Sequence, residues 1–441
     1  MVLKFNQSLF VKHGSYVVAV SGGIDSMVLL SLMNALKDEL HLTLYALHMN
    51  YHKRDSALRD QQIVEKYCKN NNIECMIADF IDSPFGNFQQ EARNQRYNQL
   101  YHFSKKVGAE AICLAHHADD QMETILMRLN RGSSFVGYAG MKEVSLYKDM
   151  PLFRPLLAES KDNIIAFAKE MNIPFGFDET NDQDEYTRNR FRHTITPFLK
   201  KENPKALQKW NEFSEDILDS YHLISKLSNQ FLEEFLVSNN ERYQIELNRF
   251  LGEEKIIQKD ILKKLVNLAS KNATELTKEH MEDIYKIIHS SKPNLKKKLD
   301  QHLFIQKSYQ VLSFQEKEMK PNSYEFKLTT FGEVSLPNDY IITISQNERN
   351  NSGKTIELWY NNLDSLFPIT FRSRKDKDTI RLTYGTKKLK DFFIDKKIPL
   401  IERNELPLII DATGEIICIP NIYTFKPDVR ETKIYITYQK G

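Results

Sequence analysis

The sequence predicts an α/β protein whose N-terminal domain is a doubly wound parallel sheet. Short β-branched apolar runs alternate with helical segments over residues 16–129, and a Ser-Gly-Gly turn follows the first run. A chain of 441 residues, with 41% hydrophobic and 27% charged residues, is long enough for two or three globular domains. We therefore expect this sheet to be the first of several domains.

Four pairs of strand and helix make up the predicted sheet. Each apolar run has the length of a buried strand, and each segment after it has the spacing of a helix. The expected strands cover residues 16–20, 42–48, 74–78 and 111–115, and the expected helices cover 27–33, 61–71, 88–107 and 119–129. Parallel sheets of this kind bind ligands beyond the carboxyl ends of their strands, so segments 21–26, 48–59 and 116–123 are expected to form one site.

The chain changes character after about residue 200. Between Lys205 and Lys298 most residues are charged or follow helical apolar spacing, whereas the tail has strand-like runs such as 325–328 and 341–344. The expected domains are an α/β domain, a helical connector or substrate domain and a small α+β domain, over residues 1–204, 205–322 and 323–441.

Charge, hydropathy and cysteine content narrow the class of protein. The net charge of +2 permits a nucleic-acid partner without implying one. Because no apolar run has signal-peptide or membrane-spanning character, we expect a cytoplasmic protein without membrane association. The cysteines lack the spacing of zinc ribbons or redox motifs; they are Cys68, Cys75, Cys113 and Cys418. A metal site could be suspected at Cys113, His116 and His117, but a second pair of ligands is missing. A strand cysteine followed by two loop histidines is therefore the favoured interpretation.

The segment Ser21-Gly22-Gly23-Ile24-Asp25-Ser26 has the pattern of a phosphate-binding loop between a strand and a helix. Its glycines let backbone N–H groups approach an anion, the helix adds the positive end of its dipole, and the serine hydroxyls can donate to phosphate oxygens. Asp25 would repel phosphate directly, so its expected role is to hold Mg²⁺ against it. The absence of GxxxxGK[ST] and GxGxxG patterns argues against Walker-type and dinucleotide loops. A simple glycine turn is the alternative.

This loop is similar to that of the N-type ATP pyrophosphatases, the PP-loop superfamily. Its members cleave ATP to AMP and pyrophosphate while activating a carbonyl oxygen as an adenylate. The resemblance implies an adenine nucleotide alpha hydrolase-like fold, with ATP and Mg²⁺ as cofactors.

Longer segments resemble one family of that superfamily, the tRNA(Ile)-lysidine synthetases. The segments that carry the resemblance are 48–59, 115–124 with its continuation 128–132, 154–157, 178–182, 188–193, 385–393 and 403–407. The tail departs from the family at Lys377-Asp378, where a Gly-Asp turn is usual. A 2-thiocytidine tRNA sulfurtransferase family shares the 115–124 pattern but carries CxxC pairs, which this chain lacks.

The resemblance implies a ligase that acts on tRNA. Such an enzyme joins the ε-amine of free L-lysine to C2 of the wobble cytidine of tRNA(Ile) with a CAU anticodon, through an adenylated cytidine, and releases AMP and pyrophosphate. The modified tRNA then reads AUA as isoleucine. The resemblance further implies that the C-terminal domain binds tRNA, and it leaves a monomer or a homodimer open.

Three residues are expected to be catalytic. Asp25 is the expected Mg²⁺ carboxylate. Asp119 is the expected contact to the lysine ammonium or the base for it, although acidic residues are also common at helix starts for electrostatic reasons alone. The resemblance marks Arg93 for the α-phosphate, whereas Arg96 is interpreted as a surface residue.

Other residues are expected around the site or on the tRNA. The site-lining set is His48, His116, Asp120, Arg128 and Arg131. The alternative is that the histidines only form hydrogen bonds with backbone groups and that the arginines only interact with the C-terminal end of their helix. Two basic runs are expected to contact the tRNA backbone: Arg188, Arg190 and Arg192, and Lys387, Lys388 and Lys390.

Two other functions stay open at this point. A tRNA thiolation enzyme would keep the fold but needs a sulfur-carrying cysteine near the loop. An RNA-binding protein with an inactive nucleotide fold would not need Asp25, Ser26, Arg93 and Asp119 together. The residue pattern favours the ligase over both.

Overall fold

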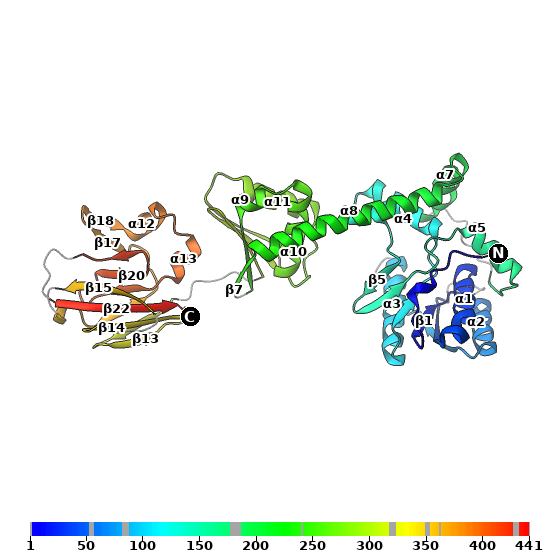
Figure 1. The fold of residues 1–441 in the computed structure, drawn as a ribbon, viewed down its shortest axis with the longest axis horizontal. Coiled ribbons are helices and arrows are strands. Elements are labelled where there is room, and N and C mark those ends of the chain that lie inside the picture. Colours follow the sequence, from blue (N-terminus) through cyan, green and yellow to red (C-terminus); the bar gives the residue numbers. More distant parts are fainter. Residues whose placement is uncertain are drawn as a thin grey trace. The chain divides into compact units, whose positions relative to one another are not determined.

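The structure, a computed structural model, describes residues 2–52, 57–81, 88–176, 187–239, 241–316, 323–348, 353–360, 363–426 and 432–440. The chain forms two compact units, Met1–Leu223 and Ile224–Gly441, which Figure 1 colours from blue to red along the sequence. Within the described ranges, no helix combines the length and the apolar character needed to cross a membrane.

A six-stranded sheet forms the centre of the first unit (Figure 1). Its order is β3-β2-β1-β4-β6-β5, and all neighbouring strands are parallel except the pair β5 and β6. The strands are β1 (Ser15–Ala19), β2 (Thr43–Asn50), β3 (Glu74–Asp79), β4 (Ala111–Cys113), β5 (Val144–Tyr147) and β6 (Met150–Phe153). The four predicted strands are confirmed to within a few residues, and the β5–β6 hairpin was not predicted from the sequence.

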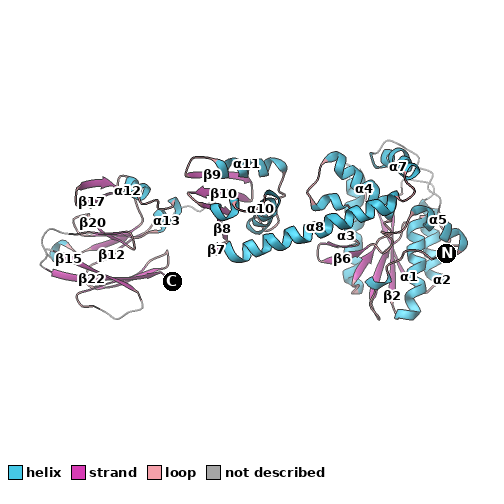
Figure 2. Ribbon diagram, turned by 45° about the horizontal axis from the view of Figure 1, so that its top comes forward, coloured by secondary structure: helices cyan, strands magenta, loops and turns pink. Residues whose placement is uncertain are grey.

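Helices cover both faces of this sheet (Figure 2). One face carries α1 (Ile24–Leu40), α2 (Ala57–Asn70) and α5 (Lys161–Glu170), and the other carries α3 (Phe88–Val107). Along β1, Val18 packs with the first group and Val17 with α3, because successive strand residues point to opposite faces. The strand order reverses between β1 and β4, which confirms the predicted doubly wound sheet.

Further helices follow the sheet in the first unit. They are α4 (Ala118–Arg131), α6 (Thr187–Arg190), a π-helical turn (Phe191–Ile195), α7 (Thr196–Glu202) and the start of α8 (Ala206–Phe235), with 3₁₀ turns at Gln7–Leu9 and Val136–Ala139. Ser214 of α8 donates to the Ala139 carbonyl at 2.6 Å and accepts from the Gln121 amide at 3.0 Å, which ties α8 to α4. The boundary between the two units falls inside α8. Domain limits at residues 204 and 322 stay a prediction.

The second unit begins with helices packed on a five-stranded antiparallel sheet of order β7-β8-β11-β10-β9. Its elements are β7 (Val237–Asn239), β8 (Arg242–Glu246), α9 (Leu247–Leu251), α10 (Lys255–Ala269), α11 (Lys278–His289), β9 (Asn294–Asp300), β10 (Leu303–Ser308) and β11 (Val311–Gln315). The predicted helices are present, and the sheet was not anticipated. Edge strand β9 contains three consecutive exposed lysines, so its sequence lacks the alternating apolar residues of a typical strand.

The rest of the second unit is mostly β-structure, as Figure 2 shows by its magenta strands. One sheet contains β12 (Glu325–Leu328), β16 (Ile369–Arg372), β19 (Leu408–Ile410), β20 (Ile416–Ile419) and β21 (Tyr423–Thr424). A second contains β13 (Gly332–Ser335), β14 (Tyr340–Ser345), β22 (Thr432–Lys440) and β15 (Lys354–Tyr360). The other elements are the hairpin β17 (Thr379–Leu382) and β18 (Gly385–Lys388), α12 (Leu389–Asp395), α13 (Leu400–Glu405) and a 3₁₀ turn at Leu363–Ser365. Ile342 and Phe371 join the two sheets in one apolar core, so the predicted α+β region is confirmed.

The Lys377-Asp378 turn lies at the start of this β17–β18 hairpin. Arg372 donates to both carboxylate oxygens of Asp378 at 2.9 and 2.7 Å, and the Lys375 N–H donates to the same carboxylate at 2.7 Å. Lys377 has a φ of 73°, in the left-handed region where glycine is the preferred residue. Both carboxylate oxygens of Asp378 therefore accept hydrogen bonds, whereas the backbone of Lys377 before it is strained.

We expect Lys377→Gly to stabilise the second unit by roughly 0.5–1 kcal/mol, because it removes this left-handed strain. Urea denaturation would measure the change. Lys396→Gly is the matched control, since Lys396 has a φ of −77° and gains nothing from glycine. A loss of stability in both variants would contradict the expectation.

Candidate active site

The loop from Ser21 to Ser26 joins β1 to α1 at the point where the strand order reverses. Ser26 Oγ donates to the Gly23 carbonyl at 2.9 Å and accepts from the Ser21 N–H at 3.1 Å, and the two serine hydroxyls lie 3.1 Å apart. Gly23 is the N-cap of α1, and no described side chain caps the helix there. The first N–H groups of α1 therefore remain suited to an anion.

Close packing against α2 holds this loop in place. The Gly176 N–H donates to the Gly22 carbonyl at 2.9 Å, and Gly22 has a φ of 85°. A Cβ on Gly176 would lie 1.9 Å from Asp60 Oδ1, and one on Gly22 would lie 2.9 Å from Asp60 Cβ. Asp60 can therefore approach the loop this closely only because glycine occupies both positions.

Asp25 is paired with a lysine from α5. Lys161 Nζ donates to both carboxylate oxygens of Asp25, at 2.6 and 2.7 Å. The Lys161 and Asp25 side chains remain 32% and 30% exposed, and His117 Nε2 lies 3.9 Å from the same carboxylate. Another cation can therefore reach Asp25 from solvent.

Asp119 links α4 to α5 and α7. It accepts from the Lys161 N–H at 2.8 Å and from Lys200 Nζ at 2.9 Å, and Lys200 also contacts Asp162 at 2.8 Å. Burial opposes ionisation of Asp119, but the nearby His117 imidazole and the hydrogen bonds from Lys161 and Lys200 outweigh it and hold its pKa well below the ordinary value. Such a carboxylate suits an ammonium contact and is a weak base.

Two arginines contact the next two carboxylates of α4. Arg188 Nη2 and Arg192 Nη2 each donate to Asp120 Oδ1 at 2.9 Å, and their Nε atoms donate to Glu123 at 2.9 and 2.8 Å. Burial opposes ionisation of Asp120, but His117 and Arg188 outweigh it and lower its pKa to about 2. Asp120 is therefore ionised at neutral pH and keeps its cationic partners.

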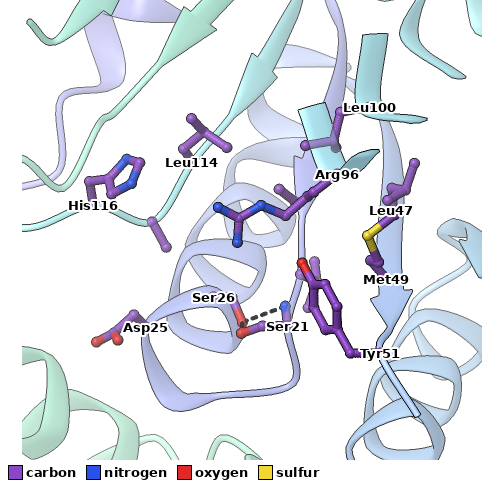
Figure 3. A pocket seen from close by; sticks show the side chains of 13 residues that line it. Ser21, Asp25, Ser26, Leu47, Met49, Tyr51, Arg96, Leu100, Leu114 and His116 are labelled. Carbon is purple, nitrogen blue, oxygen red and sulfur yellow. Dashed lines mark hydrogen bonds between the residues drawn. The ribbon is translucent and has the colours of Figure 1, made fainter. Parts of the chain in front are cut away.

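A pocket opens beside the phosphate-loop candidate, between the carboxyl ends of the central strands and α3 (Figure 3). Its lining includes Ser21, Ser26, Met49, Tyr51, Arg96 and His116. Arg96 extends into the pocket, and its Nε is buried without a hydrogen-bond partner among the described residues. Because a buried donor without a partner is costly, this guanidinium is suited to an anionic ligand.

His116 is held as a neutral imidazole at the edge of this pocket. Its Nδ1 accepts from Arg154 Nε at 3.2 Å, which places the imidazole proton on Nε2. Burial lowers the pKa of His116 to about 3; Asp120 opposes this shift, and Arg154 adds to it. At neutral pH His116 can therefore donate a hydrogen bond to a ligand, and it cannot act as a base through Nδ1.

Comparison with known proteins assigns the chain to a family. Residues 2–199 match the model of the PP-loop domain, and residues 368–434 match that of the TilS substrate C-terminal domain. The tRNA(Ile)-lysidine synthase of Aster yellows witches'-broom phytoplasma is 34% identical over 430 residues, which cover 96% of this chain and 94% of that protein. The chain belongs to the tRNA(Ile)-lysidine synthase family.

Other members of the family are similarly related. The tRNA(Ile)-lysidine synthase of Bacillus subtilis is 31% identical over 439 residues, which cover 94% of this chain and 91% of that protein. The Bifunctional protein TilS/HprT of Listeria monocytogenes serotype 4b is 33% identical over 426 residues, which cover 92% of this chain. The chain spans only 64% of the length of that bifunctional protein.

In this member of the family, Arg96 and not Arg93 lies in the pocket. Arg93 is exposed; its guanidinium lies 4.8 Å from the ring centroid of Tyr97, and its Nη2 lies 3.3 Å from the Tyr97 hydroxyl. Arg96 is therefore not the surface residue that was expected, and the role of Arg93 stays a prediction. Arg96 precedes the pocket residue Leu100 by one helical turn, so the two side chains share a face of α3. Arg93 lies seven residues before Leu100 on the same helical face, so this spacing alone does not distinguish the two arginines.

Of the expected site-lining residues, His116 lies in the pocket and Asp120 in the neighbouring carboxylate cluster. His48 does not line the pocket: strand alternation turns it to the opposite face of β2, where Nδ1 lies 3.0 Å from the Val20 carbonyl. Arg128 donates to the carbonyls of Gly137 and Gly140 at 2.6 and 2.5 Å, which supports the turn after α4. Arg131 is exposed in the last turn of α4, as a simple helix-end residue would be.

The expected tRNA-binding residues lie in different settings. Arg188 and Arg192 direct their guanidiniums to the carboxylates of α4, whereas Arg190 is exposed and contacts Thr187 at 3.1 Å. Lys387 is paired with Asp395, and Lys388 and Lys390 are exposed. Contact with tRNA stays a prediction for all six. The family segment 178–182 and residues 53–56 lie outside the described residues.

Three further charged residues of the site were not predicted from the sequence, namely Lys161, Lys200 and Glu123. Glu123 lies within a recognised motif, and its spacing from Asp120 places both on one face of α4. Lys161 is the first residue of α5, where the helix dipole disfavours a cation. A lysine at that position is a local signal for a nearby anion.

We expect His116 to remain neutral from pH 8 to pH 5, because its pKa is lowered to about 3. An unfolded histidine titrates near pH 6.5, so the contribution of buried neutral His116 to stability is complete above that pH and declines as the pH falls toward 3. NMR titration of histidine-labelled protein would test this, with His116→Gln to assign the resonance. A midpoint near 6.5 for that resonance would contradict it.

Proposed function

We propose that the chain is an ATP-dependent tRNA(Ile)-lysidine synthase. It joins the ε-amine of free L-lysine to C2 of the wobble cytidine of tRNA(Ile) with a CAU anticodon, so that the tRNA reads AUA as isoleucine. First, O2 of the cytidine attacks the α-phosphorus of ATP and pyrophosphate leaves. The lysine amine then attacks C2, AMP leaves with the former O2, and the new C–N bond forms with loss of a proton.

The observation that carries this proposal is that the Ser21–Ser26 loop and Arg96 line one pocket. The loop offers hydroxyl and backbone donors that suit the two phosphates that leave together. Arg96, with its buried Nε lacking a described partner, suits the charge that develops around the α-phosphate. Adenylation needs positioning and charge neutralisation, and this pocket supports both.

The Asp25 carboxylate is a suitable ligand for the Mg²⁺ that usually accompanies ATP. Its two oxygens already contact one cation, the Lys161 ammonium, and the carboxylate is partly exposed beside the loop. One carboxylate together with phosphate oxygens is a common ligand set for Mg²⁺ in proteins. When bound, Mg²⁺ would neutralise part of the triphosphate charge.

Asp119 is the proposed contact for the lysine ammonium. Its Oδ1 already accepts from a primary ammonium, that of Lys200, at 2.9 Å, so its surroundings suit a lysine side chain. Its lowered pKa keeps the carboxylate ionised, which favours binding the ammonium over taking its proton. The second unit is the proposed tRNA-binding part, with Lys388 and Lys390 as exposed cations for phosphate contact.

The cysteines favour lysine transfer over sulfur transfer. None of the four is among the residues that line the described pocket. Cys113 is fully buried, which raises the pKa of its thiol, and burial raises the pKa of Cys418 to about 12. Thiols of this kind stay protonated and unreactive at neutral pH.

Incubation with ATP, Mg²⁺, radiolabelled lysine and an unmodified tRNA(Ile) transcript bearing CAU tests the proposal. We expect label that survives mild alkali, with one AMP and one pyrophosphate released per lysine. Asp25→Asn should lower the rate by about 100-fold, whereas Asp38→Asn, on the exposed side of α1, is the matched control. Label removed by alkali, or pyrophosphate release without stable label, would refute the lysine step.

Arg96→Met and Arg93→Met decide which arginine serves the α-phosphate. We expect Arg96→Met to lower kcat for tRNA-dependent pyrophosphate release by about 100-fold, because it removes a pocket donor, and Arg93→Met to change it by less than about threefold. A pyrophosphate assay under saturating ATP measures both variants. The opposite order would return the role to Arg93.

A further inference from the structure

Lys161 occupies a helix position that local electrostatics do not favour. It is the first residue of α5, directly after the N-cap Ser160, whose Oγ accepts from the Asn163 N–H at 3.2 Å. The positive end of the helix dipole disfavours a cation there and favours an acidic residue. The lysine is therefore better explained by what its side chain reaches than by the helix itself.

The backbone of Lys161 is anchored while its side chain is extended. Its N–H donates to Asp119 at 2.8 Å, and the preceding Ser160 N–H donates to Glu159 at 2.7 Å. From this anchor the side chain reaches both oxygens of Asp25 and remains 32% exposed. A lysine ammonium on a flexible stem can change partners without moving the backbone that carries it.

We propose that Lys161 is a polyphosphate-binding residue that exchanges its partner when the nucleotide binds. Without nucleotide, its ammonium neutralises Asp25 beside the Ser21–Ser26 loop. With ATP and Mg²⁺ present, Asp25 serves the metal and the ammonium moves to an oxygen of the β- or γ-phosphate. This inference rests on one part of the proposed function, namely that the loop binds ATP.

A purely structural role for Lys161 makes the opposite prediction. If the ammonium only restrains Asp25, its removal leaves the carboxylate more available to Mg²⁺, and binding of the metal nucleotide stays equal or becomes tighter. If the ammonium moves to the polyphosphate, its removal costs a charge-assisted hydrogen bond in the bound state. The direction of the change in affinity therefore separates the two roles.

Calorimetric titration of the full chain with α,β-methylene ATP and Mg²⁺, without tRNA or lysine, provides the test. We expect Lys161→Met to weaken binding by about tenfold or more, and Lys161→Arg to retain affinity within about threefold, because it keeps the positive charge. Lys169→Met removes the same charge from the exposed last turn of α5 and should change nothing. Pyrophosphate affinity should fall in Lys161→Met, whereas AMP affinity should not.

A second pair of variants keeps the test decisive if Lys161→Met alone unfolds. Asp25→Asn should bind the metal-free analogue more tightly than the wild type, because it releases the ammonium for phosphate. The double variant Asp25→Asn/Lys161→Met should lose that gain; a double variant that retains it would overturn the proposal.

Other outcomes of these measurements would refute different steps. If folded Lys161→Met binds α,β-methylene ATP with Mg²⁺ as tightly as the wild type does, or more tightly, the proposed exchange is also overturned. An equal loss of affinity for AMP in Lys161→Met would overturn it too, because the lysine would then act on the nucleoside part of the nucleotide. Absence of binding by the wild type would instead refute the ATP loop, and failure of lysine transfer with intact nucleotide binding would refute only the lysine step.

Discussion

Four carboxylates gathered near one edge of the parallel sheet impose the main electrostatic constraint on the first unit. Asp25 lies in the first turn of α1, and Asp119, Asp120 and Glu123 lie on the first turns of α4. Carboxylates withdrawn from water need positive partners, and the described lysine and arginine partners come from residues 161–200, while His117 of the same edge lies beside three of the four carboxylates. The segments that follow the sheet in sequence therefore pack over its edge because their lysines and arginines complete these ion pairs.

The same ion pairs bear on the proposed chemistry. In the proposed reaction, a triphosphate would bring an anion to the loop, and a free lysine would bring an ammonium to the carboxylates of α4. Binding of either substrate would exchange one ion pair for another, which costs less than exposing a buried charge. Partial exposure of Asp25 and of Lys161, against 1% exposure of Glu123, indicates that exchange is easiest at the loop and hardest deep in α4.

Local patterns in the sequence predicted some features well and others badly. The strands of the first sheet were found because each is buried on both faces and reads as a continuous apolar run. Strand β9 was missed because it is an edge strand rich in lysine. His48 was expected to line the site because it closes the strand, but Leu47 and Met49 line the pocket and strand alternation turns His48, which lies between them, to the other face.

The doubly wound sheet, the phosphate-loop candidate and the family could be predicted from the residues alone, because these depend on contiguous patterns of apolar spacing and on short motifs. The folded chain was needed to show that Arg96 enters the pocket, that Arg188 and Arg192 contact carboxylates, and that Lys161 contacts Asp25. Those contacts join residues far apart in the chain, and burial decides which charges must pair. A local run of residues predicts neither the distance between such groups nor their burial.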